Sequence, residues 1–159
     1  MEVFLQPGEL WFGGRDTRIR TVLGSCVSIT LWHPERLLGG MCHYMLPTRG
    51  ARRASDPDGR YADEALELLL RDIKKARTEP REYVVKMFGG GNMFPTAAAT
   101  RANTGHVGLR NVEAGQELLC AHGFVCKAEH LGGHGHRNLI FNVWNGDVWM
   151  KHIETPGNS

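Results

Sequence analysis

The sequence predicts an α+β domain in which hairpin-rich sheets, mixed or antiparallel, are layered with two main helices. Three observations support this prediction. Two segments carry an apolar face at helical spacing, and six or seven short apolar runs of strand type are separated by turn residues. In addition, 20 glycines in 159 residues indicate many tight turns.

Length and composition favour one domain over residues 1–159, since a chain of this length buries about 70% of its unfolded surface. The 42% apolar and 23% charged residues are typical of soluble globular proteins and argue against disordered, collagen-like and coiled-coil classes. A net charge of +2 is too small to indicate nucleic-acid binding. The N-terminus has no signal-peptide pattern and no run approaches about 18 apolar residues, so we expect a cytoplasmic protein with free thiols and no membrane insertion.

The first elements along the chain are a hairpin and a helix. Val27–Trp32 and Gly39–Leu46 are strand-like and are separated by the turn residues HPER. Residues 48–59 are rich in Arg, Asp, Pro and Gly, which indicates a long exposed loop. Residues 60–76 predict a helix, with acidic residues early, lysines late and one apolar face. That face consists of Ala62, Ala65, Leu66, Leu69, Ile73 and Ala76.

The second half of the chain also combines predicted strands with one helix. Residues 82–88 predict a buried strand that ends in three glycines. A second helix is predicted from Asn111, a favoured N-cap residue, to Gly123, a favoured C-terminal stop. Residues 124–131 predict a strand, and residues 138–153 predict two strands around an Asn-Gly pair, a strong hairpin signal.

Cys26 and His43 lie on the two arms of the first predicted hairpin, where they could be opposite each other. If they are directly opposed, the turn is centred between Pro34 and Glu35, where turn residues occur. Directly opposed side chains have Cβ atoms about 4.5–5.5 Å apart, within reach for a thiol and an imidazole, but a slip of one residue would place them on opposite faces. A lone cysteine before a strand is more often a small buried hydrophobe, and Cys42 is expected in the core for that reason.

A cysteine and a histidine in contact form a nucleophile and its base. The thiolate is the reactive form, and a neighbouring imidazolium lowers the thiol pKa from its usual value of about 8.5. Gly24 and Ser25 directly precede Cys26. Such small residues let a carbonyl substrate approach the backbone, whose N–H groups are candidates to hold an oxyanion.

Six motifs follow one another along nearly the whole chain. They read TVLGSCVSITLW, CHYMLP, RYADEALELLL, KMFGGGNMF, VGLRN and LGGHGHRNLIFNVWNGDVW. Together they resemble the CheD family of chemoreceptor glutamine deamidases. The resemblance implies a CheD-like cysteine hydrolase fold and a cytosolic enzyme without a cofactor. Its implied reaction converts glutamines of methyl-accepting chemotaxis receptors to glutamates.

The resemblance also assigns the catalytic residues. It implies Cys26 as the nucleophile, His43 as the general base and a threonine shortly before the cysteine as the third member of a triad. Thr21 is the candidate, five residues ahead of Cys26. An odd spacing within one straight strand would separate the two faces, so the chain must bend around Gly24. Arg20, at even spacing, is the competing residue.

Other functions are compatible with parts of this pattern. CheD-like proteins are also implied to dock on a CheC-type phosphatase, so a regulatory binding module that acts independently of catalysis is the alternative. A cysteine protease or a transglutaminase would share the acyl-enzyme step. In the favoured reaction the Cys26 thiolate attacks the glutamine carbonyl, and His43 protonates the departing ammonia and then activates a water.

Two further motifs share features with known binding sites. Residues 120–136 are dense in soft metal ligands, but they lack the close paired spacing of structural zinc sites, so no metal site is expected. These ligands are Cys120, His122, Cys126, His130, His134 and His136. Gly89–Gly91 lacks the pattern of a phosphate-binding loop and indicates a tight turn or a place of close substrate approach, which His106 and Arg110 are candidates to border.

Overall fold

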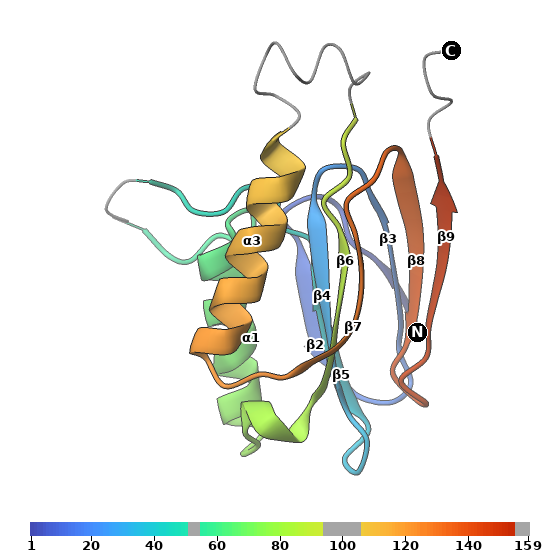
Figure 1. The fold of residues 1–159 in the computed structure, drawn as a ribbon. Coiled ribbons are helices and arrows are strands. Elements are labelled where there is room, and N and C mark those ends of the chain that lie inside the picture. Colours follow the sequence, from blue (N-terminus) through green and yellow to red (C-terminus); the bar gives the residue numbers. More distant parts are fainter. Residues whose placement is uncertain (51–54, 94–105, 155–159) are drawn as a thin grey trace.

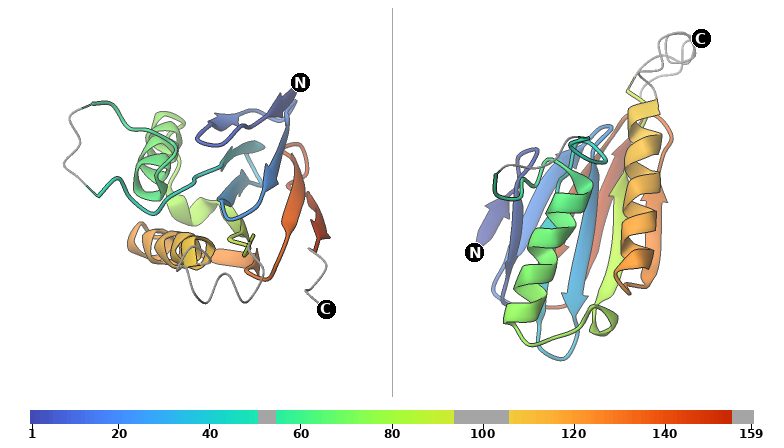
Figure 2. Two further views of the ribbon diagram at one scale, coloured as in Figure 1. Left: turned by 90° about the horizontal axis from the view of Figure 1, so that it is seen from above. Right: turned by 90° about the vertical axis from the view of Figure 1, so that its left-hand side faces the viewer.

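In the computed structural model, which describes residues 1–50, 55–93 and 106–154, two sheets are stacked face to face. Two helices cover the outer face of one sheet (Figure 1). Figure 2 shows both helices on the same side, so that the layers are helices, a central sheet and an outer sheet. The expected α+β class with mixed sheets and two main helices is confirmed.

The central sheet has five strands in the order β2-β5-β4-β6-β7. Neighbours are antiparallel except β6 and β7, which are parallel because the chain between them passes through a helix. The strands are β2 (Leu10–Gly13), β4 (Val27–His33), β5 (Leu38–Cys42), β6 (Val84–Gly89) and β7 (Cys126–Leu131).

The outer sheet has four strands in the order β1-β3-β8-β9, with β1 and β3 parallel and the other pairs antiparallel. The strands are β1 (Glu2–Phe4), β3 (Arg18–Leu23), β8 (His136–Asn142) and β9 (Val148–Ile153). The expected count of six or seven strands is wrong, since the described residues form nine. The missed strands are β1, β2 and β3: two are very short, and β3 buries Thr21 while it exposes Val22, which obscures its alternation.

The first helix, α1 (Ala62–Lys75), begins two residues later and ends one residue earlier than expected. It buries every member of the expected apolar face except Ala76, which follows the helix and is half-buried. A short 3-10 turn, η1 (Pro80–Glu82), leads into β6. The second helix, α3 (His106–Ala121), begins five residues earlier than expected. Asn111 as its N-cap is therefore wrong, because Asn111 lies inside the helix and is fully buried. Gly123, with φ +80°, follows the helix end as expected.

Alternation along β4 and β5 divides the buried side chains into two cores. One lies between the helices and the central sheet and contains Val27, Ile29, Leu31, Cys42 and Tyr44. The other lies between the two sheets and contains Ile19, Leu23, Met41 and Phe141, with Cys26 at its border. Cys42 is a core residue, as expected.

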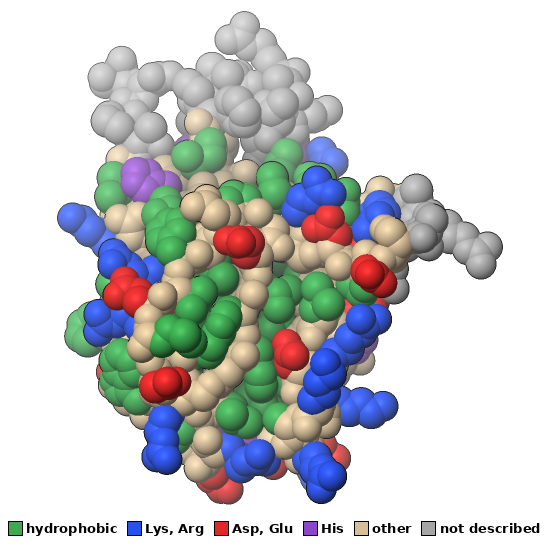
Figure 3. Space-filling view, turned by 180° about the vertical axis from the view of Figure 1, so that it is seen from behind, with side chains coloured by type: hydrophobic (Ala, Val, Ile, Leu, Met, Phe, Trp, Pro, Cys, Tyr) green, Lys and Arg blue, Asp and Glu red, His purple; other side chains and the backbone are tan. Residues whose placement is uncertain are grey.

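The surface carries charges of both signs. In Figure 3, which views the molecule from behind, acidic and basic side chains are interspersed around apolar ones. None of the helices in the part of the chain that the structure describes is long and apolar enough to cross a membrane.

Candidate active site

The candidate catalytic residues come from both sheets. Thr21 lies on β3 of the outer sheet, whereas Cys26 directly precedes β4 and His43 directly follows β5 in the central sheet. The chain therefore crosses from one sheet to the other between Leu23 and Val27. The bend expected around Gly24 is confirmed by this crossing.

The register of the hairpin differs from the expected one. Pairing of His33 with Leu38 and of Val27 with Tyr44 shifts β5 by two residues, so direct opposition of Cys26 and His43 is wrong. The shift arises because the connection has four residues, 34–37. Its end is closed by a hydrogen bond of 2.8 Å from the N–H of Leu37, which has φ +50°, to the His33 carbonyl.

A shift of two residues preserves the face of each side chain. His43 lies between Cys42 and Tyr44, which both face the helices, so its ring points into the space between the sheets. Cys26 packs against the core in that same space. The two side chains thus share one side of the central sheet, although no hydrogen bond among the described residues joins the thiol to the ring.

The ring of His43 is held by Thr21 across the two sheets. The Thr21 Oγ1 lies 2.7 Å from His43 Nδ1 and donates a hydrogen bond of 2.8 Å to the Leu5 carbonyl. A carbonyl only accepts, and a hydroxyl has one hydrogen, so Oγ1 must accept the Nδ1–H of His43. This leaves Nε2 of the neutral ring as the unprotonated nitrogen, free to act as a base. Arg20 instead pairs with Glu2 at 2.9 Å on the other face of β3.

Burial sets the protonation of both candidate catalytic groups. Desolvation raises the pKa of the Cys26 thiol and lowers the pKa of His43 to about 4. The sequence-based expectation that an imidazolium lowers the thiol pKa is therefore wrong for the free protein, because a ring buried this deeply is neutral. The resting pair is a thiol and a neutral imidazole, and such a thiol reacts as a nucleophile only after a base has taken its proton.

The backbone around Cys26 is anchored through three consecutive carbonyls. Each of them accepts a hydrogen bond from another part of the fold: Gly24 from the Gly91 N–H at 3.0 Å, Ser25 from Asn111 Nδ2 at 3.0 Å, and Cys26 from the Gly90 N–H at 2.8 Å. Within the described residues, no hydrogen bond uses the N–H group of any of these three. The turn thus directs its acceptors inward and keeps its donors available.

The glycines at the end of β6 allow this close approach. Gly89 and Gly90 have φ values of +112° and +69°, and a Cβ on Gly89 would collide with the Cys26 carbonyl. The N–H groups of Gly90 and Gly91 are used by the Cys26 turn, so they are not available to cradle a phosphate. From the other side, Gly108 of α3 packs so tightly that an added Cβ would lie 2.5 Å from the Gly90 carbonyl oxygen.

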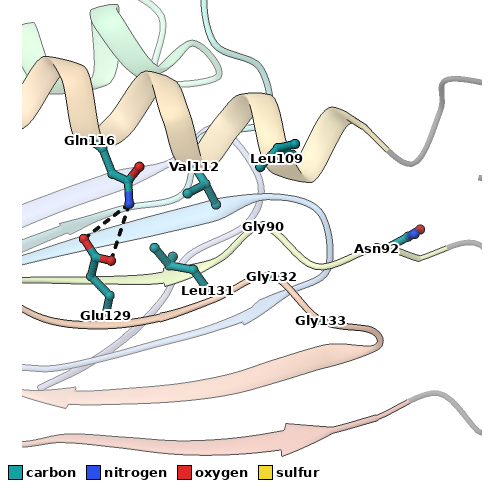
Figure 4. Close-up of a pocket in the computed structure, with 9 residues that line it drawn as sticks. All are labelled: Gly90, Asn92, Leu109, Val112, Gln116, Glu129, Leu131, Gly132 and Gly133. Carbon is teal, nitrogen blue, oxygen red and sulfur yellow. Dashed lines mark hydrogen bonds between the residues drawn. The ribbon is translucent and has the colours of Figure 1, made fainter.

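A hollow of about 420 Å³ opens beside this turn, between α3 and β7 (Figure 4). Glycines and apolar side chains form most of its lining, and Gln116, 3.4 Å from Glu129, closes one end. The lining includes Gly90, Gly132, Gly133, Leu109, Val112 and Leu131. His106 and Arg110, expected as possible borders, are exposed on α3 and are not part of this lining.

Comparison with known proteins identifies the family of the chain. Residues 45–152 match the family described as "CheD chemotactic sensory transduction". The chain belongs to the CheD family. A relative from Pseudomonas savastanoi pv. phaseolicola, "Probable chemoreceptor glutamine deamidase CheD", is 52% identical over 95% of this chain and 84% of its own length. A relative of the same description from Pseudomonas fluorescens is 50% identical over 95% and 84%. One from Dechloromonas aromatica is 50% identical over 94% and 86%.

In this CheD-family chain, the ligand-rich segment is used for other contacts. Among the described residues, which include all six of its histidines and cysteines, no three potential ligands gather to hold a metal ion. His130 Nδ1 accepts a hydrogen bond of 2.9 Å from Arg137 Nε, and the His152 ring packs edge-on against His130. Cys120 is exposed near the end of α3.

Two buried polar residues near the site make contacts that the sequence did not predict. Arg137, 1% exposed, donates to the carbonyls of Gly89 at 3.3 Å and Gly132 at 2.6 Å, so it braces the glycine turn. Asn111 binds the Cys26 turn directly. The available signals were a charged residue at an inward position of a strand and an asparagine within a helical segment. Both residue types also occur at surfaces and caps, so neither signal is specific.

Proposed function

We propose that this chain is a chemoreceptor glutamine deamidase in which Cys26 is the nucleophile, His43 the general base and Thr21 the residue that orients His43. The names of the relatives support the activity. The observation that carries the residue roles is the hydrogen bond between Thr21 and His43, because it leaves Nε2 of a neutral ring to receive a proton. The shared face of Cys26 and His43 supports the same assignment.

The first half of the proposed reaction forms an acyl-enzyme. His43 Nε2 takes the thiol proton as Cys26 Sγ bonds to the side-chain carbonyl carbon of the glutamine, and the carbonyl electrons move onto its oxygen. The imidazolium then gives its proton to the amide nitrogen, the carbon–nitrogen bond breaks and ammonia leaves. The product is a thioester between Cys26 and the former glutamine.

The second half regenerates the enzyme. His43 removes a proton from a water whose oxygen attacks the thioester, and the carbon–sulfur bond breaks as the thiol regains its proton. The glutamine has become a glutamate, and one water has been consumed for each ammonia released. Every proton moves among the chain, the substrate and water, so we expect no cofactor.

The N–H groups of the Gly24–Cys26 turn are the proposed donors to the oxyanion in both halves. Their carbonyls are bound elsewhere in the fold, and their hydrogens are not used within the described residues. One such donor is worth about 10²–10³ in kcat in other acyl-transfer enzymes. In this proposal Gly24 and Ser25 lie on the substrate side of Cys26.

The proposed setting is the cytoplasm, with residues 1–159 as one deamidase domain and the methyl-accepting chemotaxis receptors as substrates. A CheC-type phosphatase is a proposed second partner. Binding to either protein without chemistry is the alternative function, and it does not require the Cys26 thiol.

The test is incubation with a chemoreceptor cytoplasmic fragment, followed by peptide mass analysis. We expect glutamine-to-glutamate conversion with the wild-type chain and with the matched control Cys42→Ala, but none with Cys26→Ala. Retained binding by Cys26→Ala would separate docking from catalysis. Equal conversion by Cys26→Ala and wild type would refute the role of the thiol, and backbone cleavage or an amine adduct would indicate a protease or a transglutaminase.

A further inference from the structure

Asn111 lies on the inner face of α3 and is fully buried. Its side-chain nitrogen uses both hydrogens, donating to the Ser25 carbonyl at 3.0 Å and to the Met45 carbonyl at 2.8 Å. Ser25 precedes Cys26, and Met45 follows His43 by two residues. A single amide group therefore connects the chain segments that flank the nucleophile and the base.

The bond to Ser25 fixes the direction of the Cys26 N–H. The carbonyl of Ser25 and the N–H of Cys26 belong to the same peptide group, which is trans like the other described peptide bonds. In a planar trans peptide these two groups point in opposite directions. A donor held on the carbonyl therefore aims the N–H away from α3, and it also polarises the peptide so that the N–H becomes a better donor.

The other two anchors of the turn come from the backbone. The carbonyls of Gly24 and Cys26 accept hydrogen bonds from the N–H groups of Gly91 and Gly90. Among the described residues, the Ser25 carbonyl is bound only by the Asn111 side chain. The Asn111 Oδ1 is buried without a hydrogen-bond partner in the described part of the chain. An unpartnered buried oxygen is destabilising. The contribution of Asn111 to this contact therefore comes from its two N–H donors and not from its side-chain oxygen.

We propose that Asn111 is a positioning residue that holds the Ser25–Cys26 peptide so that the Cys26 N–H donates to the oxyanion. This inference rests on the proposed deamidase activity. Asn111 touches neither the substrate nor the reacting atoms, and it acts through the peptide that it orients. Its loss is expected to lower kcat while the affinity for the receptor fragment is retained.

The decisive variant is Asn111→Asp, which keeps the shape but replaces both donors with an acceptor that faces two carbonyls. We expect kcat for the receptor fragment to fall by about 10²-fold at pH 8 with little change in KM, as for a misplaced catalytic group. Because burial favours the neutral acid, and a neutral acid regains one donor, the ratio of variant to wild-type kcat should rise as the pH falls. Urea unfolding over the same pH range separates this effect from a structural defect, for which the free energy of unfolding would recover in parallel with kcat.

The matched control is Tyr44→Phe. The Tyr44 hydroxyl binds the Asn111 backbone carbonyl at the same helix–sheet contact, so its removal loses a buried hydrogen bond without releasing Ser25. We expect Tyr44→Phe to keep kcat within about threefold of wild type, a small effect beside the 10²-fold loss that a misplaced catalytic group causes. Should Asn111→Asp fail to fold, Asn111→Ala is measured instead, with the same loss of kcat expected but no recovery at low pH.

Three outcomes overturn the inference. These are a kcat near wild type for folded Asn111→Asp or Asn111→Ala, an equal loss of kcat for Tyr44→Phe, and a ratio for Asn111→Asp that does not change with pH. If the wild-type chain itself converts no glutamine, the proposed function fails and the inference falls with it. An active wild type with an equally active Asn111 variant removes the inference alone.

Discussion

Replacement of Thr21 by valine tests the link between the two sheets and the base. Valine keeps the shape of threonine but removes the hydroxyl that accepts from His43 Nδ1 and donates to the Leu5 carbonyl. Both partners then remain buried without that bond, and at about 1–2 kcal/mol for each we expect a loss of about 2–4 kcal/mol in the free energy of unfolding. With the ring free to turn or change tautomer, a lost bond of about 1.4–2.7 kcal/mol lowers kcat by about 10–100-fold.

Thr78→Val provides the matched control, since Thr78 donates to the Ile73 carbonyl at 3.0 Å and contacts the Tyr83 hydroxyl at 2.7 Å, far from the site in the fold. Urea unfolding gives the stability of each variant, and mass analysis of a receptor fragment gives kcat. We expect similar losses of stability but a loss of kcat only for Thr21→Val. The reasoning is refuted if Thr21→Val retains kcat within about twofold of wild type, less than the tenfold that a bond of about 1.4 kcal/mol supplies.

Four further predictions concern the pH dependence of activity, the pH dependence of stability, thiol reactivity and packing. With the neutral ring of His43 as the proposed base and its pKa held at about 4 by burial, kcat/KM should stay level down to about that pH. An acidic limb near the usual 6.5 would contradict the burial. The unfolded chain binds the His43 proton at higher pH than the folded one, so the free energy of unfolding should decrease as the pH falls from about 6.5 toward 4 in urea titrations. Thiol reactivity is measured by peptide mapping after iodoacetamide treatment at pH 7. The exposed Cys120 should be labelled first, and the buried Cys42, whose pKa is about 12, should be labelled last. Fastest labelling of Cys26 would contradict a neutral thiol at that position. Gly108→Ala should lower both the melting temperature and kcat, although alanine has the better helix propensity. The reason is that the added Cβ would press on two backbone carbonyls next to the Cys26 turn. An unchanged melting temperature would contradict this packing.

Local patterns predicted most of the fold, because they depend on neighbours in the sequence. The buried face of α1 follows from helical spacing, and β4, β6 and β8 follow from apolar runs that end at turn residues. Strands β1 and β2 have three and four residues, too few for a periodic signal. The predicted start of α3 is too late because the sequence around a buried asparagine inside a helix looks the same as the sequence around an asparagine that caps one. Asn111 is of the first kind and binds two carbonyls that are distant in the sequence.

The candidate site depends more strongly than the fold on contacts between residues that are distant in the sequence. Direct opposition of Cys26 and His43 predicted a shared face, and the two side chains still share it because the register differs by an even number of residues. The register itself depends on the left-handed Leu37 and on the length of the turn, which no spacing rule specifies. Thr21 contacts His43 only because β3 and β4 lie in different sheets, which is a property of the whole fold. The protonation of the pair could not be predicted either, since it follows from burial that only the assembled layers create.

The hydrogen bond from His43 to Thr21 bridges the interior of a sandwich, so the proposed catalysis depends on the separation of its two layers. Leu5, Ile19 and Phe141 set that separation from within the core between the sheets. A substitution there that widens the gap slightly would disengage the base while both layers remain folded. Loss of activity without loss of structure would then arise from positions that touch neither the nucleophile nor the receptor, and screens for inactive variants should recover them.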